Sequence, residues 1–216
     1  MSLAVVYSRA KVGIDAPLVH VEAHLSNGLP AFSIVGLPEA AVKESKDRVR
    51  SAILNSGFEF PASRITVNLA PADLPKEGGR FDLAIALGIL AASDQIPKDK
   101  FADYEFIGEL ALTGAIRGVA GVIPAALNAT AAMRTLILPS ANTEEASLSR
   151  GEHLTCDHLL EICAHLIKQQ SLKGLNIIPI TQEQYHGPDL AQVKGQHHAK
   201  RALEICAAGA HNLLIL

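Results

Sequence analysis

The sequence predicts a mixed α/β fold of the α+β type. Hydrophobic residues make up 49% of the 216 residues and charged residues 19%, which is enough apolar material for a packed core. Only 4% of the residues are aromatic, so Ala, Val, Ile and Leu must supply most of that core. After residue 38, strand-like and helix-like segments alternate along the chain, which is typical of a layered α/β domain.

The first third is predicted to hold strands and one helix. Three segments have strand-like patterns and indicate an antiparallel start: 3–12, 18–25 and 32–35. A helix is expected to begin at Pro38 and to end at Gly57. Its polar face carries Glu44 and Arg48, an i,i+4 pair of opposite charge that we expect to be solvated.

The middle of the chain predicts a buried central helix. Residues 64–70 alternate as a strand, and Asp82 is expected to cap a helix that runs to about Ser93. That helix is apolar nearly all round, so it should lie in the middle of the domain. The later elements are expected in this order: strand 105–112, return strand 116–119, helix 125–133, strand 135–138, helical turns 142–148, helix 157–170 and strand 175–178.

The chain is expected to divide into one whole domain and the start of another. Residues 1–171 form the first domain, and the polar stretch around 181–188 places a linker at 172–188. A new unit is expected over 189–216, with a helix at 195–208 and a buried closing strand at 212–216.

Charge and cysteine content exclude several classes of protein. The formal net charge is −3 and the pI is about 6.3, so nucleic-acid binding would need a local basic patch or a partner domain. Three Cys do not make a disulfide framework in a chain of this size, which fits a reducing cytoplasm. The longest apolar run, residues 83–92, is too short for a membrane span, and the N-terminus lacks the features of a signal peptide. We therefore expect a soluble, cytoplasmic protein with no membrane partner.

One short region contains several side chains of the types that bind zinc. Five of them lie within thirteen positions: His153, Cys156, His158, Cys163 and His165. The spacing argues against a zinc site, because Cys163 belongs to the apolar stripe of the predicted helix, where a Cys acts as a small hydrophobic side chain. We expect no metal here.

The segment 75–82 is the most unusual part of the sequence. Gly78 and Gly79 precede the predicted helix, and Lys76 and Arg80 flank them. Backbone N–H groups at a helix N-terminus, with cations beside them, are typical of an anion site. The alternative is a tight turn whose charges are solvated. The segment is not a Walker A loop, which needs Gly-Lys followed by Ser or Thr.

The same region lacks the residues of nucleophilic catalysis. No Ser, Thr or Cys lies between Lys76 and Ala92, and no Lys lies between Lys100 and Lys168. The three nearby carboxylates do not form a marked acid/base pair either, because Asp82 has the simpler role of helix cap. No catalytic residue is predicted.

Several long motifs carry a resemblance to a known family. They are Val12-Gly-Ile-Asp-Ala-Pro17, Ile34-Val-Gly-Leu-Pro38 and, above all, the uninterrupted run Val67–Leu83. These motifs resemble the N-terminal region of the ComM/YifB proteins, which are Mg-chelatase-like AAA+ ATPases, and the resemblance covers the whole chain.

The resemblance implies the fold of the first domain. It is expected to be similar to the C-terminal domain of Lon protease and to domain 2 of ribosomal protein S5. The catalytic Ser and Lys of Lon-like proteases correspond to about Arg80 or Phe81 and to about Ile123 here. The resemblance therefore implies a Lon-like domain without peptidase activity.

The resemblance also implies that the last residues begin an AAA+ domain. Val193, Gly195 and Gln196 resemble the segment that lines the adenine pocket, and the strand expected at 212–216 resembles the one before Walker A. The family's Walker A and B residues are expected beyond residue 216, so the chain is interpreted as truncated. ATP and Mg²⁺ are implied for the full-length parent, whereas this chain is expected to need no cofactor and to be inactive alone.

The function implied is that of a binding or assembly module. The parent resembles a hexameric ATPase that acts on DNA in natural transformation and promotes branch migration. Lys76, Arg80, Arg64 and Arg117 are candidates for contacts with the DNA backbone, or the domain organises the ring. The alternatives are an accessory ATPase subunit of Mg-chelatase type, a degenerate Lon-like peptidase and an inert structural domain.

Overall fold

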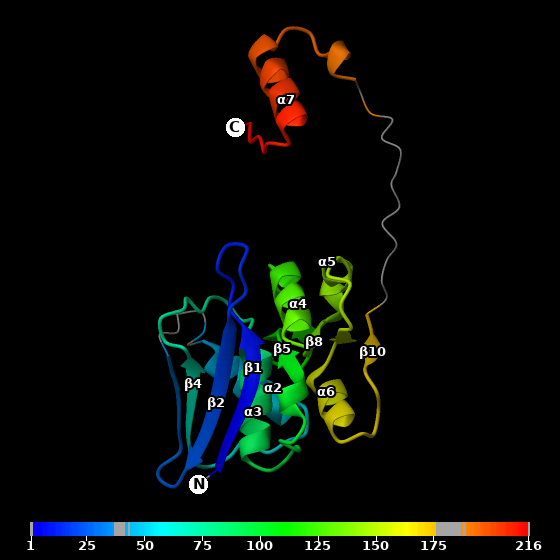
Figure 1. Cartoon of the computed structure of the whole chain (residues 1–216). Helices are drawn as coiled ribbons and strands as arrows, with labels where there is room; N and C mark the ends of the chain where they lie inside the picture. The colour runs from blue at the N-terminus through cyan, green and yellow to red at the C-terminus, as the bar shows by residue number, and fades with distance from the viewer. Residues whose placement is uncertain (1, 37–41, 43, 176–186, 188, 216) are drawn as a thin grey trace. The chain divides into compact units, whose positions relative to one another are not determined.

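The computed structural model describes residues 2–36, 42, 44–175, 187 and 189–215. The chain divides into two compact units, Met1–Ile178 and Pro179–Leu216, which are described separately (Figure 1). The two four-stranded sheets of the described residues belong to the first unit, and each is mixed. The predicted α/β class is therefore confirmed.

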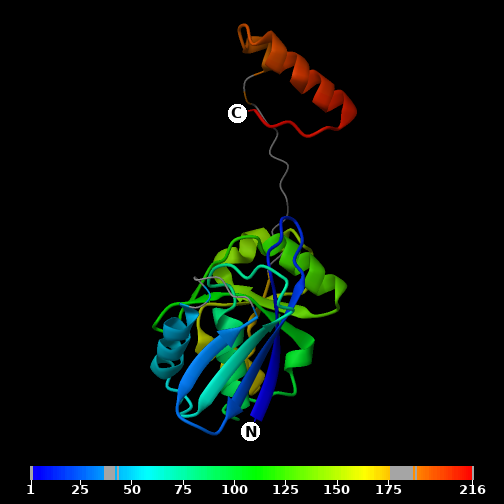
Figure 2. The ribbon, with the colours of Figure 1, turned by 90° about the vertical axis from the view of Figure 1, so that its left-hand side faces the viewer.

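The first sheet opens the chain. Its strands, in the order β1-β2-β4-β3, are β1 (Ser2–Arg9), β2 (Leu18–Ser26), β4 (Arg64–Ala70) and β3 (Ala31–Val35). The pair β1–β2 is antiparallel, as predicted. The strand β4 also pairs antiparallel with β2, whereas β3, expected in the antiparallel start, runs parallel to β4. Alternate residues of β2 and β4 are buried, because one face of the sheet packs on the core (Figure 2).

The second sheet is built from shorter strands. Its order is β10-β9-β8-β5, with β5 (Tyr104–Phe106), β8 (Thr135–Pro139), β9 (Leu154–Cys156) and β10 (Lys173–Gly174). Because β10 pairs with β9, the first unit extends beyond residue 171. Of the strand expected at 175–178, Leu175 is not in a strand, and the rest lies outside the described residues.

The single strand expected at 105–112 is instead two strands, β5 and β6 (Glu109–Leu110). Gly108 lies between these strands, and its backbone forms hydrogen bonds with residues around the start of α3. Its N–H donates to Arg80 O at 3.0 Å, and its carbonyl accepts from Leu83 N at 3.2 Å. These bonds replace ladder bonds, so the sheet pairing stops there. The return strand is the short β7 (Ile116–Arg117), which pairs with β6.

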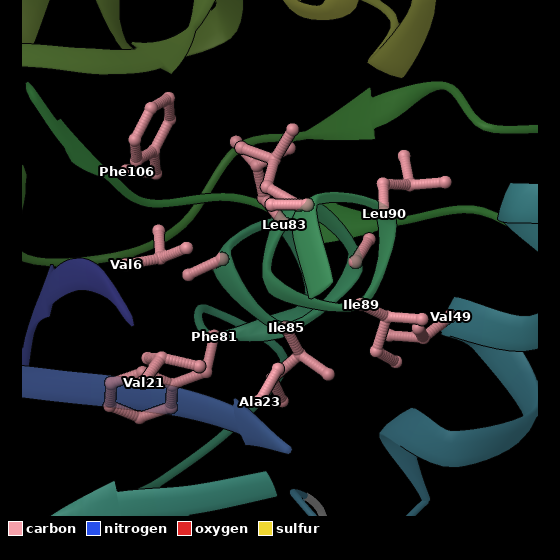
Figure 3. Packing of buried hydrophobic residues seen from close by; sticks show 14 of the residues in the cluster. Val6, Val21, Ala23, Val49, Phe81, Leu83, Ile85, Ile89, Leu90 and Phe106 are labelled. Carbon is pink, nitrogen blue, oxygen red and sulfur yellow. The ribbon is translucent and has the colours of Figure 1, made fainter. Parts of the chain in front are cut away.

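The described helices of the first unit are α2 (Ser45–Asn55), α3 (Asp82–Ala92), α4 (Val122–Ala131), α5 (Thr143–Ser147) and α6 (Leu159–Leu166). Every residue of α3 is buried, which confirms its predicted central place. In Figure 3, Val21 of β2, Phe106 of β5 and Val49 of α2 lie on three sides of this helix. The helix start expected at Pro38 lies outside the described residues.

The second unit contains a short 3₁₀ turn (Leu190–Gln192) and α7 (His197–Gly209). The helix expected at 195–208 is thus confirmed. The strand expected at 212–216 is wrong for the described residues 212–215, which form no strand. A strand needs a neighbouring strand to accept and donate its backbone hydrogen bonds, and the described residues of this unit offer none.

Candidate functional site

The candidate site lies in the segment before α3, and the contacts of Asp82 hold the start of this helix in position. Asp82 was expected to cap the helix, but it is the first helical residue and makes no side-chain cap. It is fully buried, and it accepts hydrogen bonds from Ser45 Oγ, from Arg48 Nε at 2.7 Å and from Leu110 N at 3.3 Å. Burial raises the pKa of Asp82, and the Arg48 bond opposes that shift. Arg48, which was expected to be solvated beside Glu44, therefore forms an ion pair with Asp82 that joins α2 to α3.

Arg80, two residues earlier, is a buried cation with few partners. Only 5% of the residue is exposed. Its Nη1 donates to Ala120 O at 3.4 Å, whereas Nε and Nη2 are buried without a hydrogen-bond partner among the described residues. Burial lowers the pKa of Arg80, and the charges of Glu145 and Glu77 offset part of that effect. A guanidinium held in this way lacks acceptors on its Nε–Nη2 edge.

Arg80 forms part of the wall of a cavity of about 320 Å³. The lining residues come from four parts of the first unit: Lys11, Glu77, Gly78, Gly79, Arg80, Glu109, Gly118, Val119 and Ala120. Three of the four residues predicted for the anion site, Gly78, Gly79 and Arg80, therefore meet here. The fold closes this cavity because β6 and β7 bring Glu109 and Gly118 against the glycine turn, where a Cβ on Gly79 would lie 2.5 Å from Glu109 Cγ.

Lys11 enters the site from the loop between β1 and β2. Figures 1 and 2 both show this dark-blue loop beside α4. The Lys11 side chain lies against Gly121, where an added Cβ would meet Lys11 Cδ at 3.0 Å. Sequence reasoning missed Lys11, because only the tertiary fold brings this hairpin tip to residues 77–80.

The three carboxylates in and near the cavity differ in the partners that compensate their negative charge. Glu109 pairs with Arg117 at 3.5 Å, which offsets its charge. Glu145 does not line the cavity; its Oε1 accepts from Val122 N at 2.8 Å and from Ile123 N at 3.4 Å, at the start of α4. Glu77 is exposed.

Lys76, the fourth predicted anion ligand, has a different place. It is fully buried, its Nζ donates to the Pro71 carbonyl, and it does not line the cavity. Burial lowers the pKa of this ammonium, and Asp73 opposes the shift. A buried Lys that is bonded to a backbone carbonyl is a structural group rather than a surface contact.

The remaining candidates for DNA contact, Arg64 and Arg117, do not adjoin each other. Arg64 pairs with Ser26 in the ladder of β2 and β4, at the end of the sheet opposite the 10–17 loop. Arg117 is exposed near the cavity and pairs with Glu109. The four cations therefore do not form one exposed basic surface.

Comparison with known proteins decides the family. The model of a family described as "Subunit ChlI of Mg-chelatase" matches residues 21–142, more than half of the chain. The chain belongs to the ComM/YifB family of Mg-chelatase-like proteins. The match contains every residue that lines the cavity except Lys11.

Three relatives show how much of the family's length the chain represents. Competence protein ComM of Haemophilus influenzae is 55% identical over 221 residues, and the YifB protein of Escherichia coli is 51% identical over 218. An uncharacterized protein of Mycobacterium bovis is 38% identical over 218 residues. Each match covers 100% of this chain and 43% of the relative, so the chain spans less than half the length of these ComM/YifB proteins.

The second unit has its own match within the ComM/YifB resemblance. A model described as "Magnesium chelatase, subunit ChlI" matches residues 189–216. Of the predicted adenine-pocket segment, Val193 is 40% exposed, and Gly195 and Gln196 have left-handed φ values of +71° and +52° directly before α7. The role of these three residues stays a prediction.

The His- and Cys-containing stretch at 153–165 of this ComM/YifB chain lies within the described residues. Within the described residues, no three His, Cys, Asp or Glu side chains are placed to hold a metal ion. Cys163 is 3% exposed, as its apolar stripe predicts, and burial raises the pKa of its thiol to about 12. No described helix has both the length and the apolar character needed to cross a bilayer.

Proposed function

We propose that this chain is the non-proteolytic, Lon-like module of a ComM-type AAA+ ATPase. The observation that carries the proposal is the absence of a nucleophile and a base at the positions that resemble those of the Lon-like dyad, which are about Arg80 or Phe81 and about Ile123. Among the described residues, the cavity wall beside Arg80 contains no Ser, Thr, Cys or His. Lys11 is there, but a Lys without a nucleophile cannot act as the base of a dyad.

The module serves a parent that acts on DNA in natural transformation and promotes branch migration as a hexameric ring. Support comes from the 55% identity to a protein named for competence. Because Lys76 and Arg80 are buried and Arg64 lies at the far end of the first sheet, we favour a role in organising the ring over a broad contact with duplex DNA. Duplex binding through phosphates needs several exposed cations on one surface.

ATP and Mg²⁺ belong to the parent in this proposal. Val193, Gly195 and Gln196 would contact the adenine, whereas the Walker residues that would hold the phosphates and Mg²⁺ are not among the residues of this chain. The chain alone is therefore proposed to be without ATPase activity.

The test uses the full-length protein with and without residues 1–178. ATP-dependent branch migration of a three-strand DNA junction is measured beside ATP hydrolysis. We expect removal of the module to slow migration at least tenfold and to reduce the hexamer fraction in sedimentation. Unchanged migration and assembly would contradict the proposal, and ATP-dependent insertion of Mg²⁺ into a porphyrin would favour the chelatase alternative.

A further inference from the structure

The first sheet has an open edge at β3. The sheet ends at β1 on one side and at β3 on the other (Figure 2). β1 packs against the 3₁₀ turn η1 (Phe101–Asp103) and against β5, and its Arg9 pairs with Glu105 of β5 at 2.6 Å. Among the described strands, none pairs with the outer side of β3. The described part of the chain therefore leaves β3 as the edge to which a further strand can be added.

The backbone of β3 directs unpaired groups to this open side. Ala31 N donates to Ser63 O at 3.4 Å, on the side of β4. Successive residues of a strand direct their backbone groups to opposite sides, so Ser33 also bonds towards β4, whereas Phe32 and Ile34 face outwards. The N–H and C=O groups of Phe32 and Ile34 have no hydrogen-bond partner among the described residues. The edge therefore presents two donors and two acceptors.

The side chains of β3 do not protect this edge from pairing. Natural edge strands commonly carry a charged residue, a proline or a bulge, each of which discourages the addition of another strand. The sequence of β3 is Ala-Phe-Ser-Ile-Val, which has no charge and no proline, and its register with β4 is unbroken. Val35 is 44% exposed. By contrast, the edge strand β10 of the second sheet is two residues long and contains Lys173.

We propose that β3 pairs antiparallel with β3 of a second copy of this chain, so that two four-stranded sheets join into one continuous sheet. In this register, Phe32 lies opposite Ile34 of the second copy, and the two residues exchange both of their backbone hydrogen bonds. The two-fold symmetry repeats this exchange, so every outward group of both strands is satisfied. Ser33 then lies opposite Ser33 of the second copy.

A second copy fits the edge because β3 is complementary to itself. The register places an aromatic side chain, Phe32, beside the β-branched Ile34, and Ala31 beside Val35, with no like charges opposed. A two-fold contact differs from the head-to-tail contacts that close a ring. The inference therefore goes beyond the proposed function, and its failure would leave the proposed ring untouched.

Sedimentation of the 216-residue chain at increasing concentration measures the dimer. A five-residue edge makes a small interface, so we expect a dissociation constant between about 1 μM and about 1 mM. Hydrogen exchange at the same concentrations identifies the edge. The amides of Phe32 and Ile34 should exchange more slowly as the dimer forms, whereas the Ser33 amide is protected in monomer and dimer alike. A chain that stays monomeric at about 1 mM, or unchanged exchange at Phe32 and Ile34, would overturn the proposal.

Ser33→Lys and Ser33→Glu test the register. Like charges would face each other across the two-fold axis in either variant, so each alone should dimerise at least tenfold more weakly than the wild type. An equal mixture of the two variants should dimerise at least as well as the wild type, because opposite charges then meet. Recovery in the mixture also shows that both variants fold. A mixture that stays monomeric would contradict the two-fold pairing of β3.

His24→Lys is the matched control. The register pairs His24 with Thr66 and Thr66 with Ser33, so His24 lies on the same face of the sheet, two strands away from the edge. The variant adds the same charge to that face and should dimerise like the wild type. Equal weakening by His24→Lys and Ser33→Lys, or wild-type affinity in Ser33→Lys, would place the contact elsewhere and refute the proposal.

Discussion

His153 is a buried residue whose hydrogen bonds constrain its protonation. It is 1% exposed, its Nδ1 accepts from Leu136 N at 3.3 Å, and its Nε2 lies 3.0 Å from Ser149 Oγ. The backbone N–H requires an unprotonated Nδ1, so the imidazole is neutral in the folded state. Burial lowers the pKa of His153, and the charge of Glu105 opposes that shift only in part.

A lowered pKa in the folded state makes stability depend on pH with a defined sign. The unfolded chain binds the proton more readily than the folded one. The stabilisation that neutral His153 contributes to the folded state is therefore fully present above the unfolded pKa of about 6.5. It is lost as the pH falls through the folded pKa. We expect the stability difference between wild type and His153→Gln, from urea unfolding, to be larger at pH 7.5 than at pH 5. A constant difference would contradict this assignment.

For single residues, the sequence could predict the burial of an apolar side chain but not the hydrogen-bond partners of a polar one. The apolar stripe correctly placed Cys163 inside, and the glycine pair with Arg80 correctly marked an unusual turn. Lys76 could not be distinguished from a solvated Lys, because its acceptor is the Pro71 carbonyl and depends on the path of the loop. Lys11 and Glu109 entered the cavity through tertiary contacts that have no local signal.

At the scale of elements, the joint between α2 and α3 is an ion pair across the core. Arg48 bonds Asp82 at 2.7 Å, and the Asp82 side chain is 0% exposed. Another buried pair, Arg9 with Glu105 at 2.6 Å, joins β1 of the first sheet to β5 of the second. Such pairs position elements, and removing one partner leaves a buried charge uncompensated.

We expect Arg48→Ala to lower the free energy of unfolding by about 3–5 kcal/mol, measured by urea denaturation at pH 7. Lys98→Ala is the matched control. It breaks an exposed i,i+4 pair with Asp94, at 2.9 Å, and should cost less than about 1 kcal/mol. Similar costs for the two variants would mean that the α2–α3 ion pair does not hold the helices together.

The helical period predicted a polar face for this helix, and Val49 and Ile53 lie on the opposite, buried face of α2. The same period assigned Arg48 to solvent, because a pattern within one helix does not show which other element covers its polar edge. The partner, Asp82, is 34 residues away and was explained locally as a cap. The assignment of long-range ion pairs therefore needed the packing of α2 on α3.

At the scale of the whole molecule, the class of fold and the central helix were predictable because they follow from composition and periodicity. The parallel pairing of β3 with β4 and the break between β5 and β6 were not, because both depend on long-range backbone bonds. The strand expected at 212–216 failed for a similar reason, since the described residues provide no strand beside it.

The central claim of the proposed function is that this chain has no peptidase activity, because the positions that resemble the Lon-like dyad, about Arg80 or Phe81 and about Ile123, hold neither a nucleophile nor a base. Hydrolysis of fluorescently labelled casein by the 216-residue chain tests it most directly, with active Lon protease as the positive control. We predict no release of peptides above the rate in buffer. Hydrolysis that disappears on changing a single Ser to Ala would contradict the claim.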